Sequence, residues 1–440
     1  MMKELKNHIT PLMGTDDDYD GILAMARTAR FVLIGEASHG THEFYQIRAV
    51  ITQRLIAEQD FMAVAVEADW PDAYRVNRYV KGDAVIDNAE DALSDFQRFP
   101  QWMWRNTEVR NFVDWLYDYH HAAEKQVPVG FYGLDLYSLN TSIKSVIHYL
   151  EQVDPAAAWR ARHRYGCFDA FENNPQRYGY ITSLNLDPGC EQEVIAQLKE
   201  MQQRNFASFL KNGISQDDFF SATQNARLVA DAEHYYRAMF KGRPSSWNIR
   251  DRHMADTLNA LADYLTEKYH KPAKIVVWAH NSHLGDASAT DMRKRGEINI
   301  GQLVRERYPQ ETFLIGFSTY HGTVTAASDW DQPEENKPVR EALEDSIEAV
   351  FHAMPVKDFW LNLREPKVQE LLAEQRLQRF IGVIYRPDTE RWSHYYHVQL
   401  PQEFDVIIHL DKTRALTPLR PGHRWTQTFR EFEETYPTGI

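Results

Sequence analysis

Two glutamates, an aspartate and several histidines lie at or just beyond the ends of short apolar runs in this chain. Carboxylates and imidazoles are the side chains that commonly transfer protons in catalysis near neutral pH. Continuous apolar runs are typical of strands covered on both faces, as in a parallel α/β sheet. Because open parallel sheets bind ligands outside the carboxyl ends of their strands, we expect these side chains to converge on one cleft of an enzyme. The runs and the polar residues after them are 31–35 with Glu36 and His39, 61–66 with Glu67 and Asp69, 129–134 with Asp135, 275–279 with His280 and His283, and 313–317 with Ser318 and His321.

Glu36 and His39 are the first candidate pair. They lie in a turn that ends at Gly40, between a strand and a predicted helix, where backbone N–H groups face the cleft. A histidine there can act as a general base, and a nearby carboxylate can orient its ring and stabilise the imidazolium. The alternative is structural, with Glu36 as a helix cap and His39 as an ordinary turn residue.

Glu67 and Asp69 end the second run, and by strand alternation they point to the same side. Trp70-Pro71 follows, which is a typical helix start with proline in the first turn. Asp69 suits the capping role of that helix better than Glu67 does. We therefore select Glu67 as the functional carboxylate.

His280 and His283 form an H-x-x-H pattern directly after a buried strand. They could hold a metal, donate to an oxyanion or orient a water molecule. The spacing does not decide, because zinc motifs of this kind usually lie on a helix as H-E-x-x-H. A divalent metal is thus an open alternative, and its candidate ligands are Glu36, His39, Glu67, His280 and His283.

Arginines supply the opposite charge. Arg48 lies in the predicted helix after the first turn, and Arg250 and Arg252 flank Asp251 just before another predicted helix. An arginine near clustered carboxylates keeps them ionised and can clamp a substrate carboxylate or carbonyl. The alternative for each arginine is an ion pair on a helix surface.

Several catalytic motifs are absent from the sequence. It contains no G-x-S-x-G nucleophile elbow, no P-loop and no G-x-G-x-x-G. Ser38 is adjacent to His39, but sequence neighbours rarely align as nucleophile and base. Activated water is the more natural nucleophile for a cleft built from histidine and glutamate.

Composition indicates a globular protein with a large core. The chain has 440 residues, 43% of them hydrophobic, and a net charge of −14, which disfavours nucleic acid as a partner. The start lacks a signal peptide, and no apolar run is long enough to span a bilayer, so we expect a cytoplasmic protein without membrane contact. Its two cysteines, Cys167 and Cys190, could pair, but we expect two free thiols in a reducing compartment.

The order of patterns predicts an α/β fold with a mostly parallel central sheet flanked by helices. Helices are expected near 41–58, where Thr41 can form the cap, and near 69–79 and 106–125. Strand signals vanish between 154 and 271, which we interpret as a helical insertion or cap, and they return at 274, including 379–385 and 405–410. The expected segments are 1–153, 154–271 and 272–440, with the first and last forming one α/β domain.

At these residues the chain resembles the erythromycin esterase family. The resemblance covers nearly the whole chain, and the combination of its first and last strand-end stretches is specific. The matching stretches are 34–40, with Gly35-Glu36-Ala37-Ser38-His39-Gly40, 66–70, with Glu67-Ala68-Asp69-Trp70, 99–108, 133–135 and 278–283, and the end segment 405–415 is similar as well.

This resemblance implies an α/β fold with a helical portion and hydrolysis of the macrolactone ester of macrolides such as erythromycin. His39 would be the general base, with Glu36 and Glu67 orienting it or the water, and His280 and His283 would bind or polarise the carbonyl. The substrate-binding residues would be Arg48, Arg250, Asp135 and Trp102. Aromatic residues that could line a pocket for a large apolar ring are Phe99, Trp102, Trp104 and Trp247.

Two alternatives to a macrolide esterase stay open. One is a metal-dependent hydrolase of another ester, amide or phosphoester, which would use the same residues as ligands. The other is a binding protein that holds a small molecule without converting it. The sequence does not indicate the oligomeric state.

Overall fold

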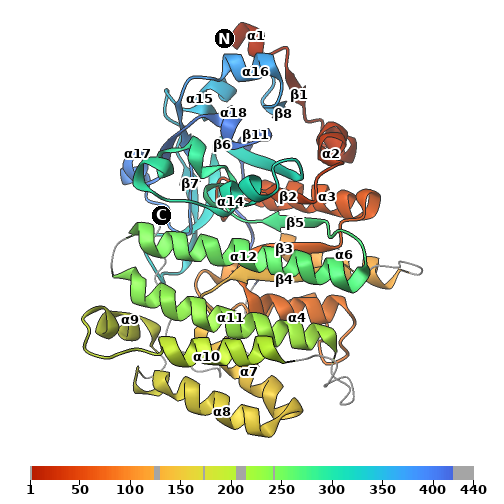
Figure 1. The fold of residues 1–440 in the computed structure, drawn as a ribbon. Helices are drawn as coiled ribbons and strands as arrows, with labels where there is room; N and C mark the ends of the chain where they lie inside the picture. Colours follow the sequence, from red (N-terminus) through yellow and green to blue (C-terminus); the bar gives the residue numbers. More distant parts are fainter. Residues whose placement is uncertain (1, 123–128, 172–173, 205–214, 241–242, 420–440) are drawn as a thin grey trace.

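A mostly parallel β-sheet forms the centre of the computed structural model, which describes residues 2–122, 129–171, 174–204, 215–240 and 243–419 (Figure 1). Its strands follow the order β1-β8-β11-β6-β2-β5-β3-β4, and β7 pairs with β6 beside this row. From β11 to β4 all neighbours are parallel, whereas β1 with β8, β8 with β11 and β7 with β6 are antiparallel. The predicted fold class is confirmed.

The five predicted strand runs all form strands of this sheet. The sheet consists of β1 (Ile9–Pro11), β2 (Phe31–Ile34), β3 (Ala63–Asp69), β4 (Gly130–Asp135), β5 (Ile275–Trp278), β6 (Thr312–Ala327), β7 (Glu334–Val339), β8 (Asp358–Asn362) and β11 (Val406–Thr413), and β9 (Arg376–Arg379) and β10 (Tyr395–Val398) form a separate antiparallel pair.

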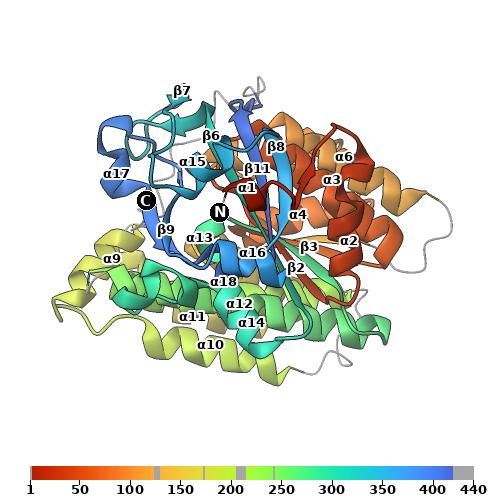
Figure 2. The same cartoon turned by 90° about the horizontal axis from the view of Figure 1, so that it is seen from above.

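Helices cover both faces of the parallel strands (Figure 2). Leu33 and Val277 belong to the core beneath α11, α12 and α14, whereas Ile34 and Val276 belong to the core beneath α3 and α6. Because successive strand residues point to opposite faces, burial on both sides requires the continuous apolar runs seen in the sequence. The helices are α1 (Met2–Leu5), α2 (Asp20–Ala26), α3 (His42–Gln59), α4 (Trp70–Val80), α5 (Ala89–Ala92), α6 (Thr107–His121), α7 (Leu139–Val153), α8 (Pro155–Tyr165), α9 (Pro175–Ser183), α10 (Glu191–Gln203), α11 (Gln216–Met239), α12 (Arg243–Tyr269), α13 (Asn281–Leu284), α14 (Ile300–Arg307), α15 (Ile347–His352), α16 (Pro366–Leu371), α17 (Glu390–Ser393) and α18 (Leu400–Glu403).

The three helices predicted in the first part of the chain are α3, α4 and α6. The last predicted residues of α6 fall partly in 123–128, outside the described residues. Thr41 precedes the first residue of α3, but its hydroxyl does not cap a helix N–H group and bonds to the Ser38 hydroxyl instead. The prediction that the Thr41 side chain caps the helix is therefore wrong, although the predicted start of the helix is right.

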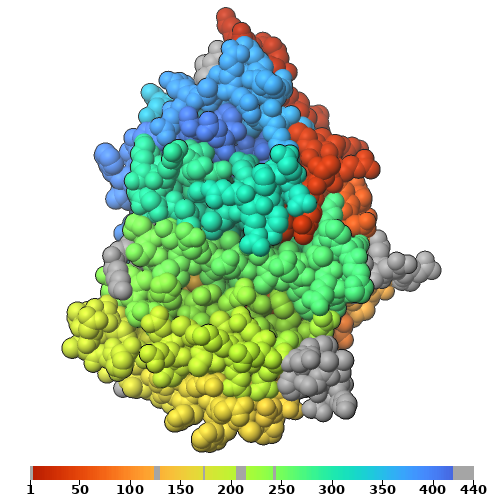
Figure 3. All heavy atoms as spheres, viewed as in Figure 1, coloured from red at the N-terminus to blue at the C-terminus, as the bar shows by residue number. Residues whose placement is uncertain are grey.

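The segment predicted to be helical contains α8 to α12, with no strand among its described residues. Helix α11 packs against α7, α10 and α12, and these helices form the lower part of the face in Figure 3. The predicted helical region is confirmed, and the division of the chain at 154 and 271 stays a prediction. The first half of α12 includes Arg250, which sequence analysis expected just ahead of a helix.

Two further expectations are wrong. Of the run 379–385 only Arg379 is in a strand. Beyond it, Ile381 and Ile384 form isolated bridges with Ser38 and Ala327, so the run does not pair continuously with any strand. Cys167 and Cys190 form a disulfide rather than two free thiols, since the turn through α9 returns the chain and leaves their Cα atoms 5.8 Å apart. Among the described helices, none is long and apolar enough to cross a membrane.

Candidate active site

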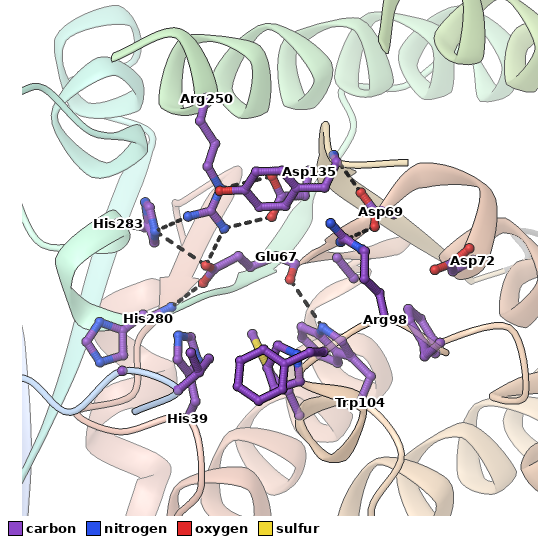
Figure 4. A pocket seen from close by; sticks show the side chains of 18 of the residues that line it. His39, Glu67, Asp69, Asp72, Arg98, Trp104, Asp135, Arg250, His280 and His283 are labelled. Carbon is purple, nitrogen blue, oxygen red and sulfur yellow. Dashed lines mark hydrogen bonds and ion pairs between the residues drawn. The ribbon is translucent and has the colours of Figure 1, made fainter. Parts of the chain in front are cut away.

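A pocket with an empty volume of about 890 Å³, including space open to solvent, lies where β2, β5, β3 and β4 end. Because β5 lies between β2 and β3, the carboxyl ends of these neighbouring strands deliver the predicted polar residues side by side. Polar and apolar side chains together line the pocket (Figure 4). The polar lining includes His39, Glu67, Asp69, Asp135, Arg250, His280 and His283, and the apolar lining includes Phe96, Phe99, Met103, Trp104, Trp247 and Val383.

His39 and Glu36 are directly bonded. His39 Nδ1 lies 2.8 Å from Glu36 Oε1, and the turn that connects β2 to α3 brings them together. With Glu36 Oε1 as the acceptor of this bond, the hydrogen of the neutral ring lies on Nδ1, and Nε2 carries the free lone pair. His39 lines the pocket, whereas Glu36 is fully buried behind it. The arrangement is that of a general base with an orienting carboxylate.

Arg48 holds Glu36 from the other side. Its Nη1 lies 3.1 Å from Glu36 Oε2, and both side chains are fully buried. The guanidinium also lies over the rings of Tyr45 and Trp278, with its central carbon 4.4 Å and 4.7 Å from the ring centroids. Arg48 does not line the pocket, so its contacts fix Glu36 and not a ligand.

Arg250 connects two carboxylates of the polar lining (Figure 4). Its Nε and Nη2 donate to the two oxygens of Asp135 at 2.9 Å and 2.7 Å, and Nη2 also donates to Glu67 Oε1 at 2.6 Å. Burial alone would raise the pKa of Glu67, but the positive charges of His283 and Arg250 outweigh it, and the pKa lies well below its usual range. Glu67 is therefore ionised.

His283 is occupied at both ring nitrogens. Nδ1 lies 2.9 Å from Asp251 Oδ1, and Nε2 lies 2.9 Å from Arg250 Nη1 and 3.3 Å from Glu67 Oε1. The ring also stacks on Trp247, with centroids 4.5 Å apart. Because neither nitrogen is open to a ligand, His283 orients Arg250 and Glu67.

His280 is adjacent to His39, with ring centroids 4.7 Å apart. Its Nδ1 accepts from the Ser282 N–H at 3.2 Å and lies 2.8 Å from Ser282 Oγ. Burial, followed by the neighbouring His39, holds the pKa of His280 well below its usual range, so the ring is neutral. Its backbone N–H donates to Glu67 Oε2 at 2.9 Å, which ties β5 to β3.

Asp69 does not cap the helix that it precedes. Its Oδ1 accepts from the backbone N–H groups of Tyr137 and Ser138 at 2.8 Å and 3.1 Å, and Oδ2 pairs with Arg98. The expected cap is thus replaced by a link from β3 to the loop after β4. Both Asp69 and Arg98 line the pocket.

The segment 96–104 supplies much of the apolar lining. The Trp104 indole donates to the Glu67 backbone carbonyl at 3.2 Å, and the Phe99 ring lies 4.6 Å from the ring of Trp330. Of the four aromatic residues predicted near the cleft, Phe99, Trp104 and Trp247 line the pocket. Trp102 packs into the core on the α3 and α6 side of the sheet instead.

The polar residues do not fit a metal centre as they are arranged. Among the described residues, no three His, Cys, Asp or Glu side chains are grouped so that they could hold one ion. Glu67 bonds to Arg250 and a backbone N–H, and His39 Nδ1 bonds to Glu36. The guanidinium of Arg250 supplies the positive charge in this cluster, and we derive no step through a metal.

Six predicted site residues therefore line one pocket, while Glu36, Arg48 and Trp102 lie behind its surface. Sequence analysis missed Asp251, which bonds to His283, and Arg98. It also left open whether Arg250 or Arg252 faces the site. In the structure α12 directs Arg250 toward Asp135, whereas Arg252 is exposed. Tyr137, two residues beyond Asp135, could have been found from its place at a strand end. The six lining residues are His39, Glu67, Asp135, Arg250, His280 and His283.

Fold and pocket together define an α/β protein with a histidine and carboxylate site at the strand ends. The family model for erythromycin esterase matches residues 56–413, and the chain belongs to the erythromycin esterase family. The matched range begins beyond Glu36, His39 and Arg48.

Curated relatives match over most of their length. The chain is 22% identical to "Putative hydrolase YbfO" of Bacillus subtilis (strain 168), covering 92% of this chain and 90% of that protein. It is 21% identical to erythromycin esterase type II of Escherichia coli, covering 90% of this chain and 94% of that protein.

Solved structures share the fold. A protein described as a succinoglycan biosynthesis protein has a TM-score of 0.77 at 20% identity and covers 94% of this chain and 97% of its own. An erythromycin esterase mutant in its open conformation has a TM-score of 0.64 at 16% identity, and the match covers 91% of this chain and 94% of that one. The differing names of these relatives leave the substrate to be argued from the site.

Proposed function

We propose that the protein is a hydrolase that cleaves a carboxylic ester with water activated by His39. The observation that carries this proposal is the bond from His39 Nδ1 to buried Glu36, which leaves Nε2 as the acceptor on the side of the pocket. Of the three histidines in the pocket, His283 is bonded at both nitrogens and His280 has a strongly lowered pKa. His39 is therefore the histidine suited to take a proton.

The reaction would need one base and no covalent enzyme intermediate. His39 Nε2 takes a proton from water, and the oxygen of that water attacks the ester carbonyl. Glu36 stabilises the imidazolium while the carbonyl oxygen is negative. The tetrahedral species then collapses, the C–O bond to the alcohol breaks, and the imidazolium returns the proton to the leaving oxygen.

The remaining polar residues would orient this reaction. Arg250, anchored to Asp135, holds Glu67 ionised, and Glu67 in turn accepts from the His280 backbone N–H. His280 is proposed to bind the carbonyl side of the substrate, as the family resemblance implies, whereas His283 orients Arg250 and Glu67. Arg48 acts only through Glu36 and is a positioning residue.

For the substrate we propose the macrolactone of an erythromycin-type macrolide. Support comes from membership of the erythromycin esterase family and from the aromatic lining of the pocket, where Phe99, Trp104 and Trp247 offer apolar surface to a large ring. A cytoplasmic enzyme of this kind would open the antibiotic inside the cell and give macrolide resistance.

Mass spectrometry of a macrolide panel tests this proposal. The purified protein and the variant His39→Ala are incubated with macrolides of several ring sizes, and the addition of one water is measured. Addition by the wild type but not by His39→Ala is expected. Turnover of a simple ester but of no macrolide would support the hydrolase assignment and reject the macrolide as substrate. A ligand retained on the purified protein, without turnover of any ester, would favour a binding protein.

A further inference from the structure

Arg48 is a fully buried cation with few polar contacts. A guanidinium carries five N–H donors, yet among the described residues none of Nε, Nη1 and Nη2 of Arg48 makes a hydrogen bond. The contact of Nη1 with Glu36 Oε2 at 3.1 Å is an ion pair outside hydrogen-bonding geometry. Because a buried charge is costly unless it is compensated, the groups around Arg48 must stabilise it mainly by electrostatic attraction.

Two aromatic rings lie against this guanidinium. Its central carbon lies 4.4 Å from the centroid of the Tyr45 ring and 4.7 Å from that of the Trp278 ring, and both rings are buried. Aromatic faces attract cations, and the weakly hydrated guanidinium of arginine stacks on them readily. The rings therefore take the place of the water that an exposed arginine binds, and Glu36 is the carboxylate that balances the charge of Arg48.

Hydrogen bonds fix both rings in place. The Tyr45 hydroxyl donates to the backbone carbonyl of His39 at 3.0 Å. Trp278 Nε1 donates to Thr52 Oγ1 at 2.9 Å, and the Thr52 hydroxyl donates to the backbone carbonyl of Arg48 at 2.7 Å. The Tyr45 ring is thus tied to the turn that carries the proposed base, and the Trp278 ring is tied to the helix α3 that carries Arg48.

Glu36 lies between two groups that compete for its negative charge. Its Oε1 accepts from His39 Nδ1 at 2.8 Å, and its Oε2 faces Arg48. A buried carboxylate without another cation beside it favours the imidazolium form of a histidine bonded to it. An imidazolium has no lone pair on nitrogen and cannot act as a base. Because Arg48 already balances the charge of Glu36, His39 can stay neutral until it takes a proton from water.

We propose that Tyr45 and Trp278 are positioning residues that hold the charge of Arg48 against Glu36 and thereby keep His39 neutral before each turnover. This proposal rests on the proposed function, in which His39 is the general base, and adds the groups that keep the base unprotonated. When water gives its proton to His39, the imidazolium is balanced by the oxyanion that forms on the ester. The charges of Arg48 and Glu36 balance each other throughout the reaction.

Nitrogen NMR of the protein with isotopically labelled histidine tests the proposal from about pH 5 to pH 8, where histidines change charge. No substrate is added, so the result does not depend on which ester is hydrolysed. The ring shifts distinguish a neutral imidazole from an imidazolium, and the His39 signals are those missing from His39→Ala. At a given pH the ratio of imidazolium to neutral ring should be about 10-fold or more higher in Arg48→Met than in the wild type. Arg48→Lys, which keeps a positive charge on a side chain of similar length, should resemble the wild type.

The contribution of the rings is tested by two pairs of variants. Trp278→Leu and Tyr45→Leu each remove a ring beside Arg48, so the ratio for His39 should rise in both, although less than in Arg48→Met. Trp115→Leu is the control for Trp278, because Trp115 packs against the same core but is not one of the two rings at Arg48. Tyr45→Phe keeps the ring and removes only the hydroxyl. Both controls should match the wild type, and thermal unfolding verifies that each variant is folded.

The double variant with Glu36→Gln and Arg48→Met separates charge from shape, because it removes both buried charges together. Its His39 should be neutral like that of the wild type, since no carboxylate is then bonded to the ring. Equal ratios in the wild type and Arg48→Met, or in Arg48→Met and Arg48→Lys, would overturn the proposal. Equal ratios in each ring variant and its control would overturn the role of Tyr45 and Trp278.

Discussion

Arg250 and Asp135, 115 residues apart in the chain, form a bidentate ion pair in the wall of the pocket. Nε and Nη2 of Arg250 donate to Oδ1 and Oδ2 of Asp135 at 2.9 Å and 2.7 Å. The pair joins the end of β4 to the first half of α12 and also supports Glu67. It therefore couples the helical region to the strand ends that carry the proposed catalytic residues.

Replacing Arg250 should destabilise the protein strongly. Arg250→Met leaves the carboxylates of Asp135 and Glu67 buried without their cation, which costs about 3–5 kcal/mol for a broken buried pair. Urea unfolding measures the change. The matched control is Arg252→Met, two residues along α12 and exposed, which should change the free energy of unfolding by less than about 0.5 kcal/mol. Similar losses in the two variants would contradict the pairing.

Removing the charge of Glu36 should affect the chemical step and not substrate binding. Glu36→Gln lacks the charge that stabilises the His39 imidazolium, so kcat should fall by about 10²- to 10⁴-fold while KM changes little. Steady-state kinetics on the ester identified by the macrolide panel measures both constants. A variant with wild-type kcat would mean that the bond between Glu36 and His39 has no role in proton transfer.

Glu67 should contribute to the stability of the protein at neutral but not at acid pH. Its pKa in the folded state lies below the ordinary value of 4.5, so the unfolded state binds its proton first as the pH falls. The stabilisation of the folded state by Glu67 is complete above pH 4.5 and is lost progressively as the pH falls below it. Free energies of unfolding from pH 7 to pH 3 should fall less steeply for Glu67→Gln than for the wild type. An exposed control, Glu344→Gln, should follow the wild-type curve.

The disulfide should stabilise the α9 region. It closes a loop between positions separated by 23 residues, and loops of this size are stabilised by about 2–4 kcal/mol. The double variant with Cys167→Ser and Cys190→Ser should lose that amount in urea unfolding. Reductant should lower the stability of the wild type and leave the double variant unchanged, and an equal effect of reductant on both proteins would argue against the bond.

Much of the sheet was predictable because its strands are covered on both faces. The run 31–35 is continuous and apolar, and the charged turn after it marks where β2 ends. The position of β5 between β2 and β3 was not predictable, since strand order depends on contacts across more than 200 residues, such as Val32 with Val276.

Site residues with only long-range partners were the ones missed. Asp69 was expected to cap α4, which is a local role, yet its carboxylate accepts from Tyr137 and Ser138 of a distant loop. Arg98 lies in an irregular segment without periodicity, so nothing in the sequence indicated its pairing with Asp69. Local patterns locate strand ends, and tertiary contacts decide which side chains meet there.

The most direct test of the proposed mechanism is the turnover of an identified ester by His39→Ala with and without added imidazole. Loss of kcat by about 10³-fold or more is expected, with part of the rate restored by imidazole, because the free base can replace the missing ring. Wild-type turnover by His39→Ala would contradict the assignment of His39 as the general base.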